Sequence, residues 1–80
     1  MRLDKYLKVS RIIKRRTLAN EACDAGRVLI NNKPAKAGSD VKAGDILEVR
    51  FGNNIFKAEI LKVAETVRKE DAALMYRNLQ

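Results

Sequence analysis

The side chains of this chain that could do chemistry are cations, and they gather at its beginning. Residues 1–16 carry seven basic side chains and one acid, whereas residues 17–80 carry ten basic and nine acidic ones. Six of the seven net positive charges therefore lie on one short segment, and a basic face on a small protein is typical of phosphate binding. The candidate RNA-binding residues are Arg2, Lys5, Lys8, Arg11, Lys14, Arg15 and Arg16.

The same cluster has an alternative interpretation, a solvated lysine-rich surface or a disordered basic tail. Apolar residues are threaded through the cluster at helical spacing, which favours a folded face. Arginine can grip phosphate oxygens with two parallel hydrogen bonds, while lysine contributes a point charge. We therefore predict that the four arginines form the centre of the site and that the three lysines surround it.

The chain lacks the residues that common catalytic and metal sites need. The chain has no histidine and a single cysteine, Cys23, which removes the usual zinc ligand sets and the histidine-based nucleophile pairs. One cysteine allows no internal disulfide and fits a reducing, cytoplasmic setting. We predict no catalytic residue, no metal and no cofactor, and we interpret Cys23 as a small buried filler rather than a reactive thiol.

Eighty residues predict one domain, residues 1–80, with a thin hydrophobic core. No apolar run approaches 18 residues, and no apolar stretch follows the basic N-terminus. We therefore expect neither a membrane span nor a secretory signal. We also expect the free protein to be a monomer.

Two helices are predicted to position the cations. Leu3, Tyr6, Leu7 and Ser10 repeat at the spacing of a helix with one buried face, which makes Tyr6 a core residue rather than a base-stacking one. A second helix is predicted from about Arg16 to Ala25, ended by glycine. Its apolar side comprises Leu18, Ala19, Ala22, Cys23 and Ala25. The connection between the helices would be anchored in the core by Ile12 and Ile13, which leaves its cations outside.

A small sheet is predicted after Gly26, where the apolar period falls to two. We expect a strand over 27–30, a tight turn at Asn31-Asn32 and a short edge strand over 33–36 that includes Pro34. Lys33 and Lys36 there are either solvated edge charges or an extension of the RNA surface. Alternating apolar residues predict a hairpin that turns at 52–54, formed by Leu47, Val49 and Phe51 with Phe56, Ala58 and Ile60.

The chain is predicted to close with a helix near residues 69–79. Ala72, Ala73, Tyr76 and Leu79 would be its inward side. The resulting fold class is α+β, with two N-terminal helices packed on a small, twisted, mostly antiparallel sheet and a C-terminal helix. The core motif would span about residues 2–50, and the hairpin and C-terminal helix about 51–80.

Four segments resemble, in this order, the RNA-binding S4 domain: residues 2–7, 15–19, 25–31 and 41–49. One departure is Asn32, which stands where the family's hairpin usually has glycine. The resemblance implies this fold and RNA binding, and it ranks Arg2 and Arg16 first because both match positions of the family motif. Asp4 would either orient an arginine of that motif or be a favourable acid in the first turn of a helix.

The whole chain is most similar to small free-standing members of this family that act in bacterial ribosome quality control. Residues 2–11, 13–19 and 70–76 carry this similarity. It implies a cytoplasmic, non-enzymatic factor that binds a stalled large ribosomal subunit obstructed by peptidyl-tRNA. Such a factor contacts large-subunit rRNA and the tRNA, and it supports a partner that adds alanine residues to the stalled chain.

Other functions stay open at this point. Within RNA binding, the alternatives are assembly of the large ribosomal subunit and tRNA binding elsewhere. DNA binding is a different class, since two short helices joined by a turn are similar to a helix-turn-helix. The second helix, however, has no array of arginine, asparagine and glutamine that could read base edges.

Overall fold

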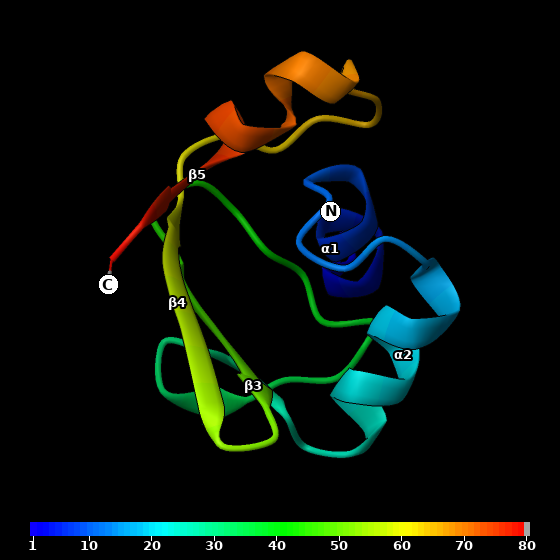
Figure 1. Ribbon diagram of the computed structural model, residues 1–80, viewed down its shortest axis with the longest axis vertical. Coiled ribbons are helices and arrows are strands. Elements are labelled where there is room, and N and C mark those ends of the chain that lie inside the picture. The colour runs from blue at the N-terminus through cyan, green and yellow to red at the C-terminus, as the bar shows by residue number, and fades with distance from the viewer. Residues whose placement is uncertain (80) are drawn as a thin grey trace.

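Two short helices cover one face of a five-stranded antiparallel sheet in the computed structural model, which describes residues 1–79 (Figure 1). The strands lie in the order β2-β1-β3-β4-β5, and every neighbouring pair is antiparallel. This confirms the predicted α+β class. The elements are α1 (Leu3–Val9), α2 (Arg16–Asp24), β1 (Val28–Ile30), β2 (Lys33–Pro34), β3 (Ile46–Phe51), β4 (Asn54–Ile60), the 3-10 helix η1 (Lys69–Met75) and β5 (Tyr76–Asn78).

The helices form where the sequence predicts them. In α1, Leu3, Tyr6, Leu7 and the following Ser10 are all buried, as their spacing indicates. After α2, the Gly26 N–H donates to the Cys23 carbonyl and the Arg27 N–H to the Ala22 carbonyl. These two bonds form a Schellman motif, and Gly26 has the positive φ, +74°, that this ending requires.

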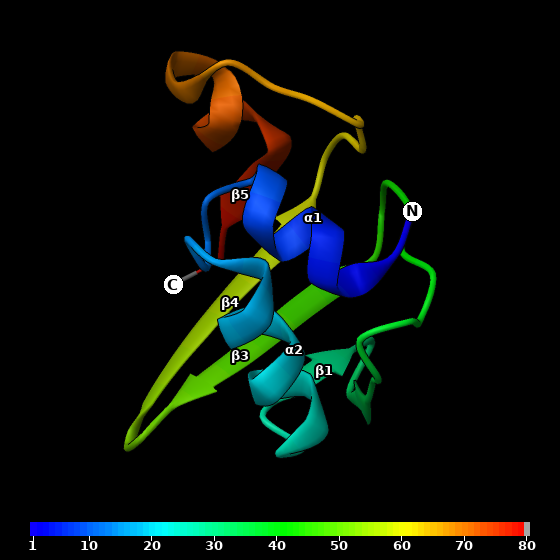
Figure 2. The same ribbon diagram turned by 90° about the vertical axis from the view of Figure 1, so that its right-hand side faces the viewer.

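The sequence predicts more buried residues on α2 than the structure shows. Ala19 and Cys23 are buried, but Leu18 is 49% exposed and Ala25 is also exposed. Because α2 meets the core through Ala19, Cys23 and the half-buried Ala22, the side chain of Leu18 stays at the margin. Phe51, at the end of β3, is likewise 45% exposed instead of buried, because β3 and β4 extend past the helices (Figure 2).

The tight turn between β1 and β2 forms without glycine. Asn31 and Asn32 both adopt positive φ, +52° and +68°, which is the conformation of a type I′ turn. The Asn31 side chain joins this turn to the start of β3: its Nδ2 donates to Asp45 at 3.2 Å, and its Oδ1 accepts the Ile46 N–H at 2.9 Å. β2 is the edge strand, as its proline predicts.

The predicted C-terminal helix over 69–79 is partly wrong. The helical part is η1, and residues 76–78 instead form β5, which pairs with β4. Ala72 is buried as predicted, but Ala73 and Leu79 are exposed, and the buried Met75 was not predicted. The reason is that the free edge of β4 offers this segment backbone hydrogen bonds, and local periodicity does not reveal such a distant partner.

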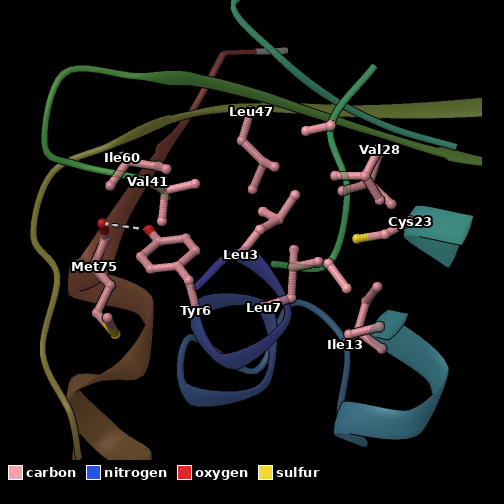
Figure 3. Packing of buried hydrophobic residues seen from close by; sticks show 14 residues of the cluster. Leu3, Tyr6, Leu7, Ile13, Cys23, Val28, Val41, Leu47, Ile60 and Met75 are labelled. Atoms are coloured by element: carbon pink, nitrogen blue, oxygen red, sulfur yellow. Dashed lines mark hydrogen bonds between the residues drawn. The ribbon is translucent and has the colours of Figure 1, made fainter. Parts of the chain in front are cut away.

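The core lies between α1 and the sheet (Figure 3). Tyr6 is fully buried, and its hydroxyl donates a hydrogen bond to the Met75 carbonyl at 2.9 Å. This excludes base stacking by Tyr6 and fixes η1 onto α1. Cys23 is buried; burial, together with the negative charges of Asp4 and Asp24, raises the pKa of its thiol to about 11. It is therefore a protonated filler.

Tyr6→Phe should lower the free energy of unfolding by about 0.5–1.5 kcal/mol, because it removes one buried hydrogen bond to the Met75 carbonyl, which keeps those from the Leu61 and Lys62 N–H groups. Urea unfolding followed by circular dichroism measures this loss. Tyr76→Phe is the matched control: the half-buried Tyr76 ring packs edge-on against Phe56, a contact that phenylalanine keeps. Equal losses in the two variants would contradict the role given to the Tyr6 hydroxyl.

Candidate nucleic-acid interface

The centre of the basic surface is a buried carboxylate held between two arginines. Asp4 is 2% exposed. Arg2 donates to it from Nε at 3.2 Å and from Nη2 at 3.3 Å, and Arg16 donates from Nε at 3.2 Å and from Nη2 at 3.4 Å. Each guanidinium thus faces both carboxylate oxygens, and the cluster Arg2–Asp4–Arg16 carries a net charge of +1.

Two further donors complete the surroundings of Asp4. Asn20 Nδ2 lies 3.4 Å from Oδ2, and the Lys5 N–H donates to Oδ1 at 2.8 Å. Burial alone would raise the pKa of Asp4, but the hydrogen bonds from Arg16, Arg2 and the Lys5 N–H outweigh it and hold that pKa below its ordinary value. The carboxylate is therefore ionised at neutral pH, and it fixes both arginines.

The two arginines come from different elements, Arg2 from the start of α1 and Arg16 from the start of α2. Residues 1–4 run along residues 37–41, with hydrogen bonds from the Leu3 N–H to the Ser39 carbonyl at 2.8 Å and from the Val41 N–H to the Met1 carbonyl at 2.8 Å. Arg2 then immediately precedes α1, while Arg16 is the first residue of α2. Packing of α1 against α2 sets the distance between them (Figure 2).

This arrangement leaves donors free for an anion. The Arg2 and Arg16 side chains are 55% and 47% exposed. A guanidinium has five N–H donors, and Asp4 receives only part of them. Two pre-oriented guanidiniums on one surface can grip phosphate oxygens, and they outweigh the single negative charge of the carboxylate that orients them.

The other predicted site residues have exposed or half-buried side chains. Lys8, Arg11, Lys14 and Arg15 are exposed, and Lys5 forms an ion pair with Glu65. Ile13 is buried and Ile12 half-buried, as predicted for the anchors of the connecting loop. Lys33 and Lys36 are exposed on or beside the edge strand β2.

Sequence reasoning missed two residues of this surface. Asn20 lies one helical turn after Arg16, so their i, i+4 spacing on α2 is the signal that could have joined Asn20 to the site. Glu65 has no such signal, because it reaches Lys5 from 60 residues away. Among residues 1–79 no group of three or more acidic or cysteine side chains could hold a metal ion, and no helix is long and apolar enough to cross a membrane.

Arg11 occupies a backbone conformation that favours glycine, with φ at +62° just after α1. Arg11→Gly should therefore raise the free energy of unfolding by about 0.5 kcal/mol, net of the entropy that glycine costs. The same variant should weaken RNA binding, because it removes a cation of the site. Arg15→Gly is the control, since Arg15 has an ordinary φ of −118° and its replacement should lower both stability and binding. Urea unfolding measures the stability of both variants, and RNA titration measures their affinity. An Arg11→Gly protein that is less stable than wild type would contradict the argument from backbone strain.

The chain is similar to known proteins in sequence and in fold. Residues 1–47 match the family model described as S4 domain. Two relatives named RQC P-site tRNA stabilizing factor are 59% identical (Halalkalibacterium halodurans, 95% of this chain and 86% of the relative) and 58% identical (Bacillus subtilis, 95% and 88%). A trimeric structure of Heat Shock Protein 15 from Vibrio cholerae superposes with a TM-score of 0.90 at 32% identity, covering 98% of this chain and 80% of that one.

The identity and the coverage extend well beyond the motif itself. They include the hairpin and the C-terminal segment that lie outside residues 1–47. The chain belongs to the S4 domain family, in the group of small proteins that includes the RQC P-site tRNA stabilizing factors.

Proposed function

We propose that this protein is a non-enzymatic RNA-binding factor of ribosome quality control that stabilises a tRNA on the large ribosomal subunit. The observation that carries the proposal is the pair of arginines that Asp4 fixes on a basic face. It is supported by the 59% identity of this chain to the RQC P-site tRNA stabilizing factor of Halalkalibacterium halodurans. The ligand groups would be backbone phosphates, bound first by Arg2 and Arg16. Lys5, Lys8, Arg11, Lys14 and Arg15 would extend the contact.

The physics of RNA favours this mode of contact. The major groove of an A-form helix is too deep and narrow for side chains to read, so proteins recognise such helices by shape and by phosphate contacts. A rigid pair of guanidiniums suits that task better than flexible lysines do. If five to seven phosphates are bound, log K should fall with log salt with a slope of about −4 to −6, by the coefficient known for duplex DNA.

In the finer form of the proposal, the target is a large subunit obstructed by peptidyl-tRNA. The basic face would contact large-subunit rRNA and the tRNA together and hold the tRNA in place. A partner factor would then add alanine residues to the stalled chain. Holding an RNA requires phosphate contacts and no reacting group, which fits a site made of guanidinium and ammonium side chains.

The test is capture of the tagged protein from native lysate, with sequencing of the RNA bound to wild type, Arg16→Gln and Arg77→Gln. The control variant loses the same charge on β5, where Arg77 pairs with Glu59. Large-subunit rRNA together with tRNA, lost only in Arg16→Gln, is the expected result. Large-subunit rRNA without tRNA would favour an assembly factor instead, and enrichment of DNA or of no RNA would overturn the proposal.

A further inference from the structure

A hollow lies between the basic loop (residues 10–15) and the tail segment (residues 61–68) that joins β4 to η1. Its volume is about 280 Å³. Its lining residues are Lys8, Val9, Arg11, Lys14, Glu65, Thr66 and Val67. Figures 1 and 2 both show the tail segment and η1 lying beyond α1, on the side away from the β3–β4 hairpin turn.

The tail segment is fixed on both sides of this hollow. At its start, the Leu61 and Lys62 N–H groups donate to the Met75 carbonyl at 2.8 and 3.1 Å. Ala64 and Val67 are half-buried and pack against the core. The two residues between them, Glu65 and Thr66, are exposed. Their place on the wall of the hollow is therefore set by packed neighbours.

The charges in the hollow are strongly unequal. Three of its residues, Lys8, Arg11 and Lys14, are exposed cations, and within residues 1–79 none of them has an ion pair. The single acid is Glu65, which pairs with Lys5 and whose side chain is 75% exposed. The hydrogen bond from Lys5 lowers the pKa of Glu65, so this carboxylate is ionised at neutral pH. One carboxylate of the protein thus lies on the wall of an otherwise cationic hollow, paired with a lysine outside the lining.

We propose that this hollow is a phosphate subsite for an RNA backbone, and that Glu65, on its wall, pairs with Lys5 until a phosphate displaces the Glu65 carboxylate. The proposal rests on the proposed function, since it adds a contact to the same RNA surface. Lys8, Arg11 and Lys14 would neutralise the phosphate, and the Thr66 hydroxyl would donate a hydrogen bond to it. Because a carboxylate and a phosphate compete for Lys5, Glu65 lowers the affinity and makes release of the RNA easier.

The test compares two charge-matched variants, Glu65→Gln and Glu70→Gln. Both remove one negative charge from an exposed side chain, but Glu70 lies in η1, outside the lining of the hollow. Titration of fluorescently labelled tRNA should show about 3- to 10-fold tighter binding for Glu65→Gln and less than a twofold change for Glu70→Gln. In a salt series the slope for Glu65→Gln should steepen by about one, because the freed Lys5 now releases a counterion on binding.

Two further variants test the subsite itself. Adding Lys5→Gln to Glu65→Gln should abolish the gain in affinity. Lys14→Gln should weaken binding severalfold, more than the edge-strand control Lys33→Gln. Equal effects of Glu65→Gln and Glu70→Gln, or weaker binding by Glu65→Gln, would overturn the inference. If wild type binds tRNA in an Arg16-dependent manner while these variants match their controls, only the subsite is wrong. If wild type binds neither tRNA nor rRNA, the proposed function fails with it.

Discussion

Arg16→Gln should weaken the binding of tRNA by about 10- to 100-fold and leave the protein folded. The variant removes one of the two guanidiniums fixed by Asp4, and a charge-assisted hydrogen bond typically contributes about 1.5–3 kcal/mol. Arg2 keeps its own two hydrogen bonds to Asp4, so the buried carboxylate retains a cationic partner. Fluorescence titration of labelled tRNA measures the loss, and circular dichroism confirms the fold.

Two comparisons make this result specific. Arg77→Gln removes the same charge outside the basic face and should change tRNA affinity by less than about twofold. Arg16→Lys keeps the charge but loses the paired donors, so its affinity should fall between wild type and Arg16→Gln. An Arg16→Gln protein that binds as well as Arg77→Gln would show that Arg16 acts only in holding Asp4.

The parts of the fold that the sequence predicts are those that local patterns determine. The buried face of α1 follows from the spacing of Leu3, Tyr6 and Leu7, and the end of α2 follows from a glycine in the left-handed region. Only the end of the predicted C-terminal helix is wrong, because β5 depends on partners in β4 that precede it by 16 to 20 residues. No local period distinguishes a helix from a strand that forms only when a free sheet edge is available.

The candidate site shows the same division between local and distant information. Charge counting along the chain is enough to collect the seven cations, because they are close in sequence. It does not show that Arg2 and Arg16 share one carboxylate, or that Lys5 is paired with Glu65, since these contacts depend on how α1, α2 and the tail segment pack.

The exposure of Phe51 also depends on tertiary structure. The alternation of apolar residues in β3 does not show how far the β3–β4 hairpin extends past the helices.

The largest loss of stability expected from a polar substitution is that of Asp4→Asn, about 2 kcal/mol at neutral pH. Removing a buried charge from its partners commonly costs about 3–5 kcal/mol, but the half-exposed guanidiniums here can turn toward water, which reduces the cost. Urea unfolding measures the change. Asp24→Asn, at the exposed end of α2, is the control and should stay within about 0.5 kcal/mol of wild type.

The pH dependence of this difference has a definite sign. The pKa of Asp4 is lower in the folded protein than its ordinary value of 3.8, so its stabilising effect is complete above that value. As pH falls through the lowered pKa, the carboxylate takes up a proton and the effect is lost. The gap in unfolding free energy between wild type and Asp4→Asn should therefore be constant near neutral pH and shrink below about pH 4. A gap that does not depend on pH would mean that shape, not charge, accounts for the loss.

RNA binding by Asp4→Asn separates positioning from charge. The substitution makes the protein more positive by one unit, so a purely electrostatic surface would bind tRNA more tightly. If Asp4 positions Arg2 and Arg16, binding should instead weaken by about 3- to 10-fold, because the guanidiniums must be ordered at a cost when the phosphate arrives. The titration is made at a temperature where circular dichroism shows both proteins folded. Tighter binding by a folded Asp4→Asn would contradict the positioning role and leave Asp4 as a residue of the fold alone.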